Sequence, residues 1–247
     1  MVTSRGAAFA ALVLLGALAQ AAASGQAQTA AGQSPLFFRE DWNGRKTPGF
    51  LPMNQGDVGN PNLLLQLYGP GALGQNRNAE NTLNITVRRP APKGGPDEAL
   101  DFIWSGMSEG NWAALLKHKD SYVDLSRPGA RIRWRSWQDG AFQVLRPVLK
   151  LADETYVVGM QGSGTTEDYV TTELMIASER WVTLDAELVL DRGNPGSVLG
   201  YTKPDLSRVD EVGVTTLSRG GGHGAAGVAA HVDWIEVYGF PVPRSVK

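Results

Sequence analysis

Cysteine is absent from this chain of 247 residues, which excludes a disulfide scaffold and a thiolate metal site. There are only three histidines, His118, His223 and His231, and they lack the close spacing of a zinc site. Stability therefore has to come from burial of an apolar core. A metal ion bound by this protein would need oxygen ligands.

An excess of charge of either sign is also missing. The 23 Lys and Arg residues face 25 Asp and Glu residues, so the formal net charge at pH 7 is −2. This balance provides no long-range attraction for nucleic acid or anionic lipid. We expect no nucleic-acid partner, and a polyanion would have to be bound by a local cluster of basic residues.

The chain has no apolar run long enough to cross a bilayer. The run from Ala7 to Ala19 has about 13 residues, whereas a membrane-spanning helix needs about 20. Arg5 precedes the run and small residues follow it, which is the pattern of a secretory signal peptide. We predict a signal peptide over residues 1–27, cleaved after Ala23 or Ala27. The mature protein would be secreted or periplasmic, without a stable membrane span.

Long amphipathic helices are not evident either. About ten short segments alternate apolar and polar residues, with glycine- and proline-rich turns between them, and this rhythm is typical of β-sandwiches and jelly rolls. We predict an all-β protein with one antiparallel β-sandwich domain of jelly-roll type over residues 36–240. A disordered leader at 28–35 would precede the domain, and a tail at 241–247 would follow it.

Two segments leave their local structure open. Residues 111–117 fit either a helical turn or a strand that passes into a loop. Pro147 lies inside the alternating segment 142–151, and a proline there favours an edge strand or a bulge because it cannot donate a ladder hydrogen bond.

The most distinctive segment is Arg131–Trp137, with the sequence RIRWRSW. In a strand, side chains alternate between the two faces, so its three arginines would line one face while Ile132 and Trp134 point to the other. We predict a half-buried strand with a cationic outer face. Trp104 and Trp234 also have apolar neighbours, and we expect them in the core with Trp134.

Sugar recognition needs flat aromatic surfaces together with planar polar groups on one face. We predict a glycan-binding face on neighbouring strands, with one histidine from a glycine-rich loop. The alternative is that the arginines pair across strands with carboxylates on a solvated sheet. Guanidinium groups suit carboxylate and sulfate, so an acidic glycan is one form of the binding hypothesis. The predicted ligand-binding residues are Arg133, Arg135, Arg146, Lys150, Tyr169, Glu173, Trp181 and His223.

Two short motifs, Asp124–Ser126 and Asp205–Ser207, have the same sequence DLS and each precedes an alternating apolar strand. With Arg180–Asp185 between them and Val232–Val237 at the end, their order resembles the galactose-binding-like β-sandwich modules. That group includes carbohydrate-binding modules and complex I intermediate-associated proteins. The resemblance covers Tyr122–Tyr238 and implies a sugar-binding or assembly module. The strand rhythm is also similar to concanavalin-like jelly rolls, which include glucanases, lyases and keto-disaccharide hydrolases.

The resemblance also implies a structural ion. In galactose-binding-like modules, a calcium ion often lies near the chain ends, and carboxylates are hard ligands that suit Ca²⁺. Glu40 and Asp41 on the first expected strand and Asp233 on the last would be its ligands. The alternative is that all three are ordinary surface carboxylates.

The sequence gives weaker support for a set of catalytic residues than for a binding face. A glycosidase needs two carboxylates about 5–9.5 Å apart, and Asp210 and Glu211 are adjacent and so are expected on opposite faces. A lyase set would combine His118 and Tyr156 with the arginines of Arg131–Trp137. No Walker loop, nucleophile elbow or dinucleotide fingerprint occurs. The sequence favours a glycan-binding module, with a glycan-active enzyme and an assembly module without a sugar ligand as the alternatives.

Overall fold

The computed structural model describes residues 33–47, 49–73, 86–89, 101–105, 111–138, 144–184, 198–217 and 229–244. The predicted signal peptide, the leader up to residue 32 and the candidate ligand residue His223 lie outside these ranges.

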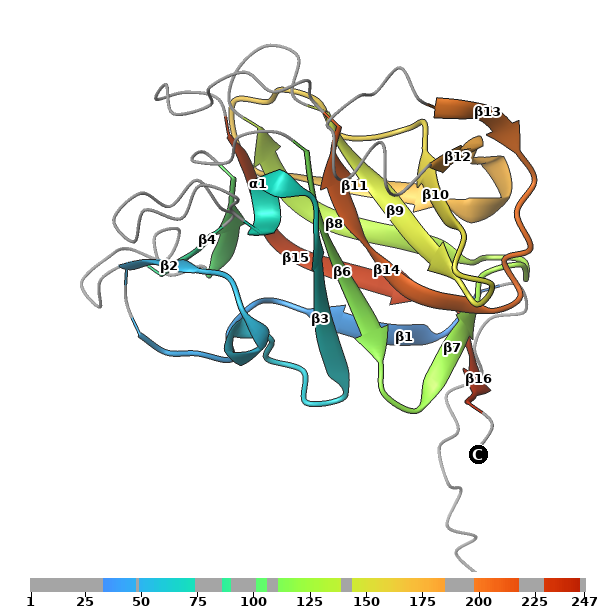
Figure 1. Ribbon diagram of the computed structural model, residues 1–247, viewed down its shortest axis with the longest axis horizontal. Helices are drawn as coiled ribbons and strands as arrows, with labels where there is room; N and C mark the ends of the chain where they lie inside the picture. The colour runs from blue at the N-terminus through green and yellow to red at the C-terminus, as the bar shows by residue number, and fades with distance from the viewer. Residues whose placement is uncertain are drawn as a thin grey trace, which may run out of the picture.

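The strands of the described residues form two sheets in which all pairings are antiparallel (Figure 1). The seven-stranded sheet has the order β11-β8-β15-β5-β4-β2, and β1 also pairs with β15. Its strands are β1 (Leu36–Glu40), β2 (Gly49–Pro52), β4 (Thr86–Arg89), β5 (Phe102–Trp104), β8 (Arg131–Gln138), β11 (Val170–Met175) and β15 (Ala230–Tyr238).

The nine-stranded sheet has the order β13-β12-β10-β9-β14-β6-β3, and β7 pairs with both β14 and β16. Its strands are β3 (Leu63–Tyr68), β6 (Trp112–His118), β7 (Ser121–Asp124), β9 (Leu145–Leu151), β10 (Tyr156–Gly159), β12 (Trp181–Leu184), β13 (Val198–Thr202), β14 (Val209–Thr216) and β16 (Phe240–Pro243).

Helical structure within the described ranges is limited to short pieces. These are α1 (Pro70–Leu73) and 3-10 turns at Gln55–Asp57 and Ile176–Ser178. No helix in this part of the chain is long and apolar enough to span a membrane. Of residues 111–117, which fitted either a helical turn or a strand that passes into a loop, all but the first lie in β6. The predicted all-β, antiparallel β-sandwich of jelly-roll type is confirmed.

One apolar core fills the space between the sheets. Ile132 and Trp134 of β8 are fully buried there, as predicted, together with Leu116 and Val212 from the nine-stranded sheet. Trp134 also donates a hydrogen bond from Nε1 to the Ser163 hydroxyl (2.9 Å), which satisfies its buried N–H. The core therefore fixes which face of β8 points outward.

β15, which is the last strand of the seven-stranded sheet in sequence, contains a β-bulge at Asp233. Val232 pairs with Ser136, but the next pair joins Trp234 to Arg135, so Asp233 is an extra residue. Strict alternation would put Val232 and Trp234 on the same face. Because of the bulge, Val232 is buried in the core while Trp234 is half-buried. The expectation that Trp234 belongs to the core is therefore wrong, and Trp104, also half-buried, is not in the core cluster either.

Pro147 lies in the middle of the nine-stranded sheet, not at its edge, and the ladder is interrupted beside it. The β9–β10 pairing stops at Val148 with Val158, and the next contact is an isolated bridge between Leu145 and Ser163. Residues 146 and 147 of β9 therefore lie opposite residues 159–162. The bulge interpretation of the proline is confirmed, because β10 requires no hydrogen bond from this position.

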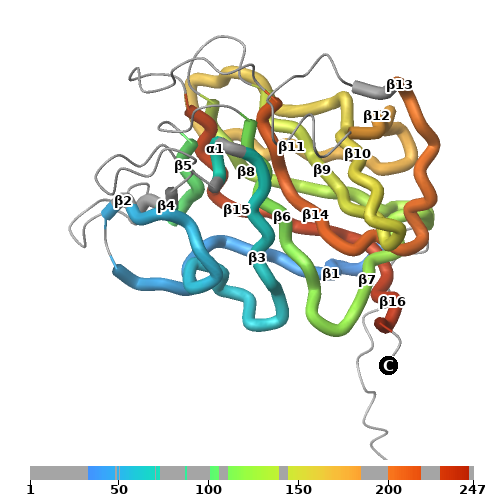
Figure 2. Tube along the Cα trace, viewed as in Figure 1, coloured from blue at the N-terminus to red at the C-terminus, as the bar shows by residue number. Residues whose placement is uncertain are grey.

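Structure continues beyond both boundaries expected for the domain. Ser34, in the expected leader, is buried and donates a hydrogen bond to the Pro128 carbonyl (3.1 Å). In the expected tail, β16 pairs with β7, and the two lie side by side near the C-terminus in Figure 2. Residues 33–35 and 241–244 thus pack against the sandwich.

Candidate functional site

The arginines of β8 lie on the outer face of the seven-stranded sheet, as their spacing predicted. β8 is paired on both sides, so Arg133 has Glu173 of β11 as one cross-strand neighbour and Glu236 of β15 as the other. We call this surface the arginine face. It consists of Arg39, Arg131, Arg133, Arg135, Trp137, Tyr169, Glu173, Asp233, Trp234, Glu236 and Tyr238.

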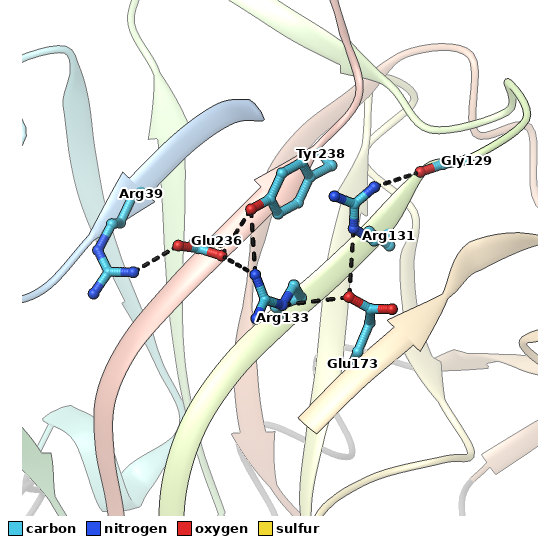
Figure 3. A network of polar contacts seen from close by, with 7 residues as sticks. All are labelled: Arg39, Gly129, Arg131, Arg133, Glu173, Glu236 and Tyr238. Carbon is cyan, nitrogen blue, oxygen red and sulfur yellow. Dashed lines mark hydrogen bonds and ion pairs between the residues drawn. The ribbon is translucent and has the colours of Figure 1, made fainter. Parts of the chain in front are cut away.

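Glu236 is the centre of the polar network drawn in Figure 3. Its Oε1 accepts a hydrogen bond from Arg39 Nη1 (2.6 Å), and its Oε2 accepts hydrogen bonds from Arg133 Nη1 and the Tyr238 hydroxyl (3.0 Å each). The Glu236 side chain is only 10% exposed. It is therefore a fixed counter-ion that holds two guanidinium groups in place.

Asp233 plays the same part for the third guanidinium. Its Oδ2 accepts a hydrogen bond from Arg135 Nη1 at 2.6 Å. Burial raises the pKa of the Asp233 carboxyl, while the hydrogen bond and charge of Arg135 act in the opposite direction. The bulge that makes Asp233 an extra residue thus also supplies a partner for Arg135.

Glu173 is held differently. It lies on β11, at the end of the strand order, and its side chain is 49% exposed. Its Oε2 lies 3.3 Å from Arg133 Nε and 3.5 Å from Arg131 Nε, longer than the usual 2.7–2.9 Å of a charge-assisted hydrogen bond. The alternative interpretation, in which the arginines pair with carboxylates across strands, is therefore what the structure shows for Arg133, Arg135 and Glu173.

Aromatic rings lie against these guanidinium groups. The Arg39 guanidinium is 4.6 Å from the Trp234 ring centre, and the Arg131 guanidinium is 3.7 Å from that of Tyr238. Trp234 and Tyr238 were not among the predicted ligand-binding residues, because alternation without a bulge gave no reason to place them beside the arginines.

A second group of rings continues the arginine face. The Arg135 guanidinium lies 4.8 Å from the Tyr169 ring, Trp137 packs 6.0 Å from Tyr169, and Trp137 lies 4.4 Å from His231. Trp137 and Tyr169 are half-buried. Trp137 was not among the predicted ligand-binding residues, although its position two residues after Arg135 places it on the same face of the strand.

Arg146, Lys150 and Trp181 do not belong to the arginine face, because their strands β9 and β12 are in the nine-stranded sheet. Trp181 is buried in the core, and Arg146 donates a hydrogen bond from Nη1 to the Met160 carbonyl. The predicted ligand-binding residues are therefore divided between two sheets. The sequence shows that these segments are strands, but not which sheet each strand joins.

Lys150 instead takes part in a tyrosine–lysine cluster with Tyr68, Tyr156 and Glu211. The Tyr68 hydroxyl donates a hydrogen bond to Glu211 Oε2 (2.9 Å), and Lys150 Nζ lies 3.6 Å from Glu211 Oε1. The rings of Tyr68 and Tyr156 meet edge to face at 5.5 Å. Burial raises the pKa of Glu211, and burial with the nearby Glu211 charge raises that of Tyr68.

A bulge also affects the adjacent acids of β14. The pairing register shifts between Val209 and Glu211, so Asp210 is the extra residue. Lys117 forms an ion pair with Asp210 (2.8 Å), and its charge also acts on Glu211. The prediction that Asp210 and Glu211 face in opposite directions is wrong for this reason.

Two of the three predicted calcium ligands, Glu40 and Asp233, have protein partners, and the charge of the third, Asp41, acts on both of them. Glu40 is buried and accepts backbone hydrogen bonds from Trp42 (2.6 Å), Gly59 (2.8 Å) and Asn60 (2.9 Å). It thereby ties β1 to the loop before β3, while Asp233 is paired with Arg135. No group of three or more His, Asp or Glu side chains arranged for a metal occurs among the described residues.

The lyase set does not form. His118 at the end of β6 accepts a hydrogen bond from the Asp120 amide and packs against Phe37. Tyr156 belongs to the nine-stranded sheet, whereas the arginines belong to the other sheet. The three residue types are thus distributed over different surfaces.

Comparison with known proteins gives structural neighbours only. No protein-family model matches the chain, and no curated protein matches it. Among solved structures, it is similar to the family 11 carbohydrate-binding module of the cellulosomal cellulase Lic26A-Cel5E of Clostridium thermocellum. The identity is 13%, the TM-score is 0.41, and the match covers 79% of this chain and 97% of that one.

A second similar structure is a family 11 carbohydrate-binding module from Clostridium thermocellum in complex with a β-1,3-1,4-mixed-linked tetrasaccharide. Its identity to this chain is 12% and the TM-score is 0.41, with 78% of this chain and 98% of that chain covered. The β-sandwich itself follows from the strand pairings of this chain, and no site residue is carried over from these modules.

Proposed function

We propose that the protein is an exported glycan-binding module that uses the arginine face. The observation that carries this proposal is the row of half-buried aromatic rings, Trp137, Tyr169, Trp234 and Tyr238, set among guanidinium and carboxylate groups on one sheet. Aromatic faces suit the C–H surfaces of pyranose rings, and planar polar groups suit sugar hydroxyls.

The ion pairs support binding by making the polar groups rigid. Arg39 and Arg133 are held by Glu236, and Arg135 is held by Asp233. A ligand that meets such pre-positioned donors loses less free energy to the ordering of side chains. The ion pairs therefore make the arginine face a more favourable surface for hydroxyl recognition than free arginine side chains would be.

The pairing of carboxylates with arginines also favours binding over catalysis at this surface. Each carboxylate of the arginine face, Glu173, Asp233 and Glu236, has at least one guanidinium partner within 3.5 Å. A carboxylate that is engaged by a guanidinium cannot at the same time approach a leaving oxygen, as a general acid must. Within this set of described residues, no carboxyl group is left for the proton donor of a glycosidase.

A glycan array of neutral and acidic polysaccharides, followed by calorimetry, tests the proposal. We expect Trp137→Ala and Trp234→Ala each to weaken binding by about 1–2 kcal/mol, because a ring that stacks on sugar is lost. That loss is about 5- to 30-fold in affinity. Tyr201→Ala is the matched control, since Tyr201 is an exposed aromatic residue on the nine-stranded sheet.

Thermal melts of all three variants check that they remain folded. Equal affinity of the wild type and both Trp variants for a glycan that does bind would remove the arginine face as the binding surface. If no glycan on the array binds and a stable protein partner is found, the alternative of an assembly module without a sugar ligand would be favoured. Release of reducing ends from any polysaccharide would favour a glycan-active enzyme.

A further inference from the structure

The three carboxylates of the arginine face are not held equally. Glu236 and Asp233 have side chains that are 10% and 6% exposed and receive hydrogen bonds of 2.6–3.0 Å from arginine. Glu173 is 49% exposed and contacts two arginines only at 3.3 and 3.5 Å. The side chains of Glu236 and Asp233 are therefore fixed by buried, short contacts, whereas the Glu173 side chain is only loosely held.

The two arginines that Glu173 contacts do not depend on it for their positions. Arg131 donates a hydrogen bond from Nη1 to the Gly129 carbonyl (3.3 Å) and stacks on Tyr238. Arg133 is fixed by Glu236 and Tyr238. Both guanidinium groups would thus keep their places if the Glu173 side chain rotated into solvent (Figure 3).

A buried donor adjacent to Glu173 lacks a hydrogen-bond partner. Arg133 Nε is enclosed, yet no acceptor among the described residues meets it with hydrogen-bond geometry. The nearest carboxylate oxygen, Glu173 Oε2, lies 3.3 Å away and is shared with Arg131 Nε. A buried N–H without an acceptor costs free energy, so an acceptor that approaches it more closely than Glu173 would be favoured.

We propose that Arg131 and Arg133 form a subsite for the carboxylate of a uronic acid, and that Glu173 occupies this subsite until the sugar displaces it. The inference rests on the proposed glycan-binding function and names the class of glycan. A uronate brings the same planar group that Glu173 now supplies, and Tyr238 lies beside Arg131 as an aromatic wall for the sugar ring.

Charge on the face is consistent with an anionic ligand. Arg39, Arg131, Arg133 and Arg135 contribute four positive charges against three negative charges of Glu173, Asp233 and Glu236. With Glu173 turned into solvent, the local balance is four to two. The carboxylate of the sugar restores it to four to three, so exchange of Glu173 for a uronate leaves the charge balance of the face unchanged.

Calorimetry with the galacturonic-acid trimer and the galactose trimer tests the subsite. Glu173→Gln removes the competing carboxylate, so we expect it to tighten binding of the galacturonic-acid trimer by about tenfold, on the scale of a charged hydrogen bond. Binding of the galactose trimer should remain within about twofold. Adding Arg131→Gln to the Glu173→Gln variant should abolish the gain.

Glu154→Gln is the matched control. It removes the same charge from an exposed glutamate, 73% exposed and paired with Lys150 of the nine-stranded sheet, and should not tighten binding of either trimer. If Glu173→Gln binds the galacturonic-acid trimer no more tightly than wild type, or not at all, the subsite is wrong. The proposed glycan-binding function would still stand if a neutral glycan bound and the Trp137 and Trp234 variants weakened it. An equal gain from Glu154→Gln would also overturn the subsite, because net charge alone would then explain the effect.

Discussion

Replacement of Glu236 by glutamine is the sharpest test of how the arginine face is held together. The carboxylate receives hydrogen bonds from Arg39, Arg133 and Tyr238, and its side chain is 10% exposed. Removing one partner of a fully buried ion pair costs about 3–5 kcal/mol. Here the two arginine side chains are 41% and 33% exposed, so water can solvate the freed guanidinium groups. We therefore expect Glu236→Gln to lower the free energy of unfolding by about 2 kcal/mol.

Glu173→Gln should cost less than about 1 kcal/mol, because exposed ion pairs contribute little. Urea unfolding followed by tryptophan fluorescence measures both variants, and about 2 kcal/mol corresponds to a fall in Tm of about 4–8 °C for a domain of this size. A double-mutant cycle with Arg39→Gln isolates the Arg39–Glu236 interaction. Equal losses for the two glutamate variants, within about 0.5 kcal/mol, would refute the distinction between a fixed and a loosely held counter-ion.

Two further predictions concern the nine-stranded sheet. Burial raises the pKa of Glu211 above its ordinary 4.5, so its contribution to stability is fully present below about pH 4.5 and is lost as pH rises through the higher folded pKa. Glu211→Gln should flatten that decline in urea midpoints, and an unchanged slope would contradict the raised pKa. Gly213→Ala should cost about 3 kcal/mol or more, because a Cβ there would lie 2.0 Å from the Ala114 carbonyl oxygen. Gly164→Ala, where a Cβ meets nothing within 4 Å, should stay within about 0.5 kcal/mol, and similar losses for both glycines would contradict the packing argument.

The faces of β8 could be predicted from sequence because β8 itself has no extra residue, the bulge in its ladder with β15 being on the partner strand. Arg133 and Trp134 lie on opposite sides, as period two requires. The same rule fails on β15 and β14, where Asp233 and Asp210 are each inserted as one extra residue and reverse the alternation that follows. Neither bulge has a glycine or proline at the position of the extra residue, so the local sequence does not predict either bulge.

Membership of a sheet is a second property that local patterns do not contain. Lys150 and Glu173 both lie in alternating strands with charged outer residues, yet one belongs to each sheet. What separates them is long-range pairing, β9 with β14 and β11 with β8. The residues predicted for one face therefore do lie together on β8 and its neighbours, whereas those on β9 and β12 belong to the opposite layer.

The place of β15 in the seven-stranded sheet bears on when the protein can fold. This strand pairs with β8 along one side and with β5 and β1 along the other, although it is synthesised well after all three of them. Until residues 230–238 have been synthesised, three earlier strands have no partner at that position. Pairings between segments so far apart in the chain form slowly and leave strand edges exposed meanwhile. Completion of this sheet therefore waits for residues 230–238, and a nascent chain is expected to need protection from aggregation until these residues emerge.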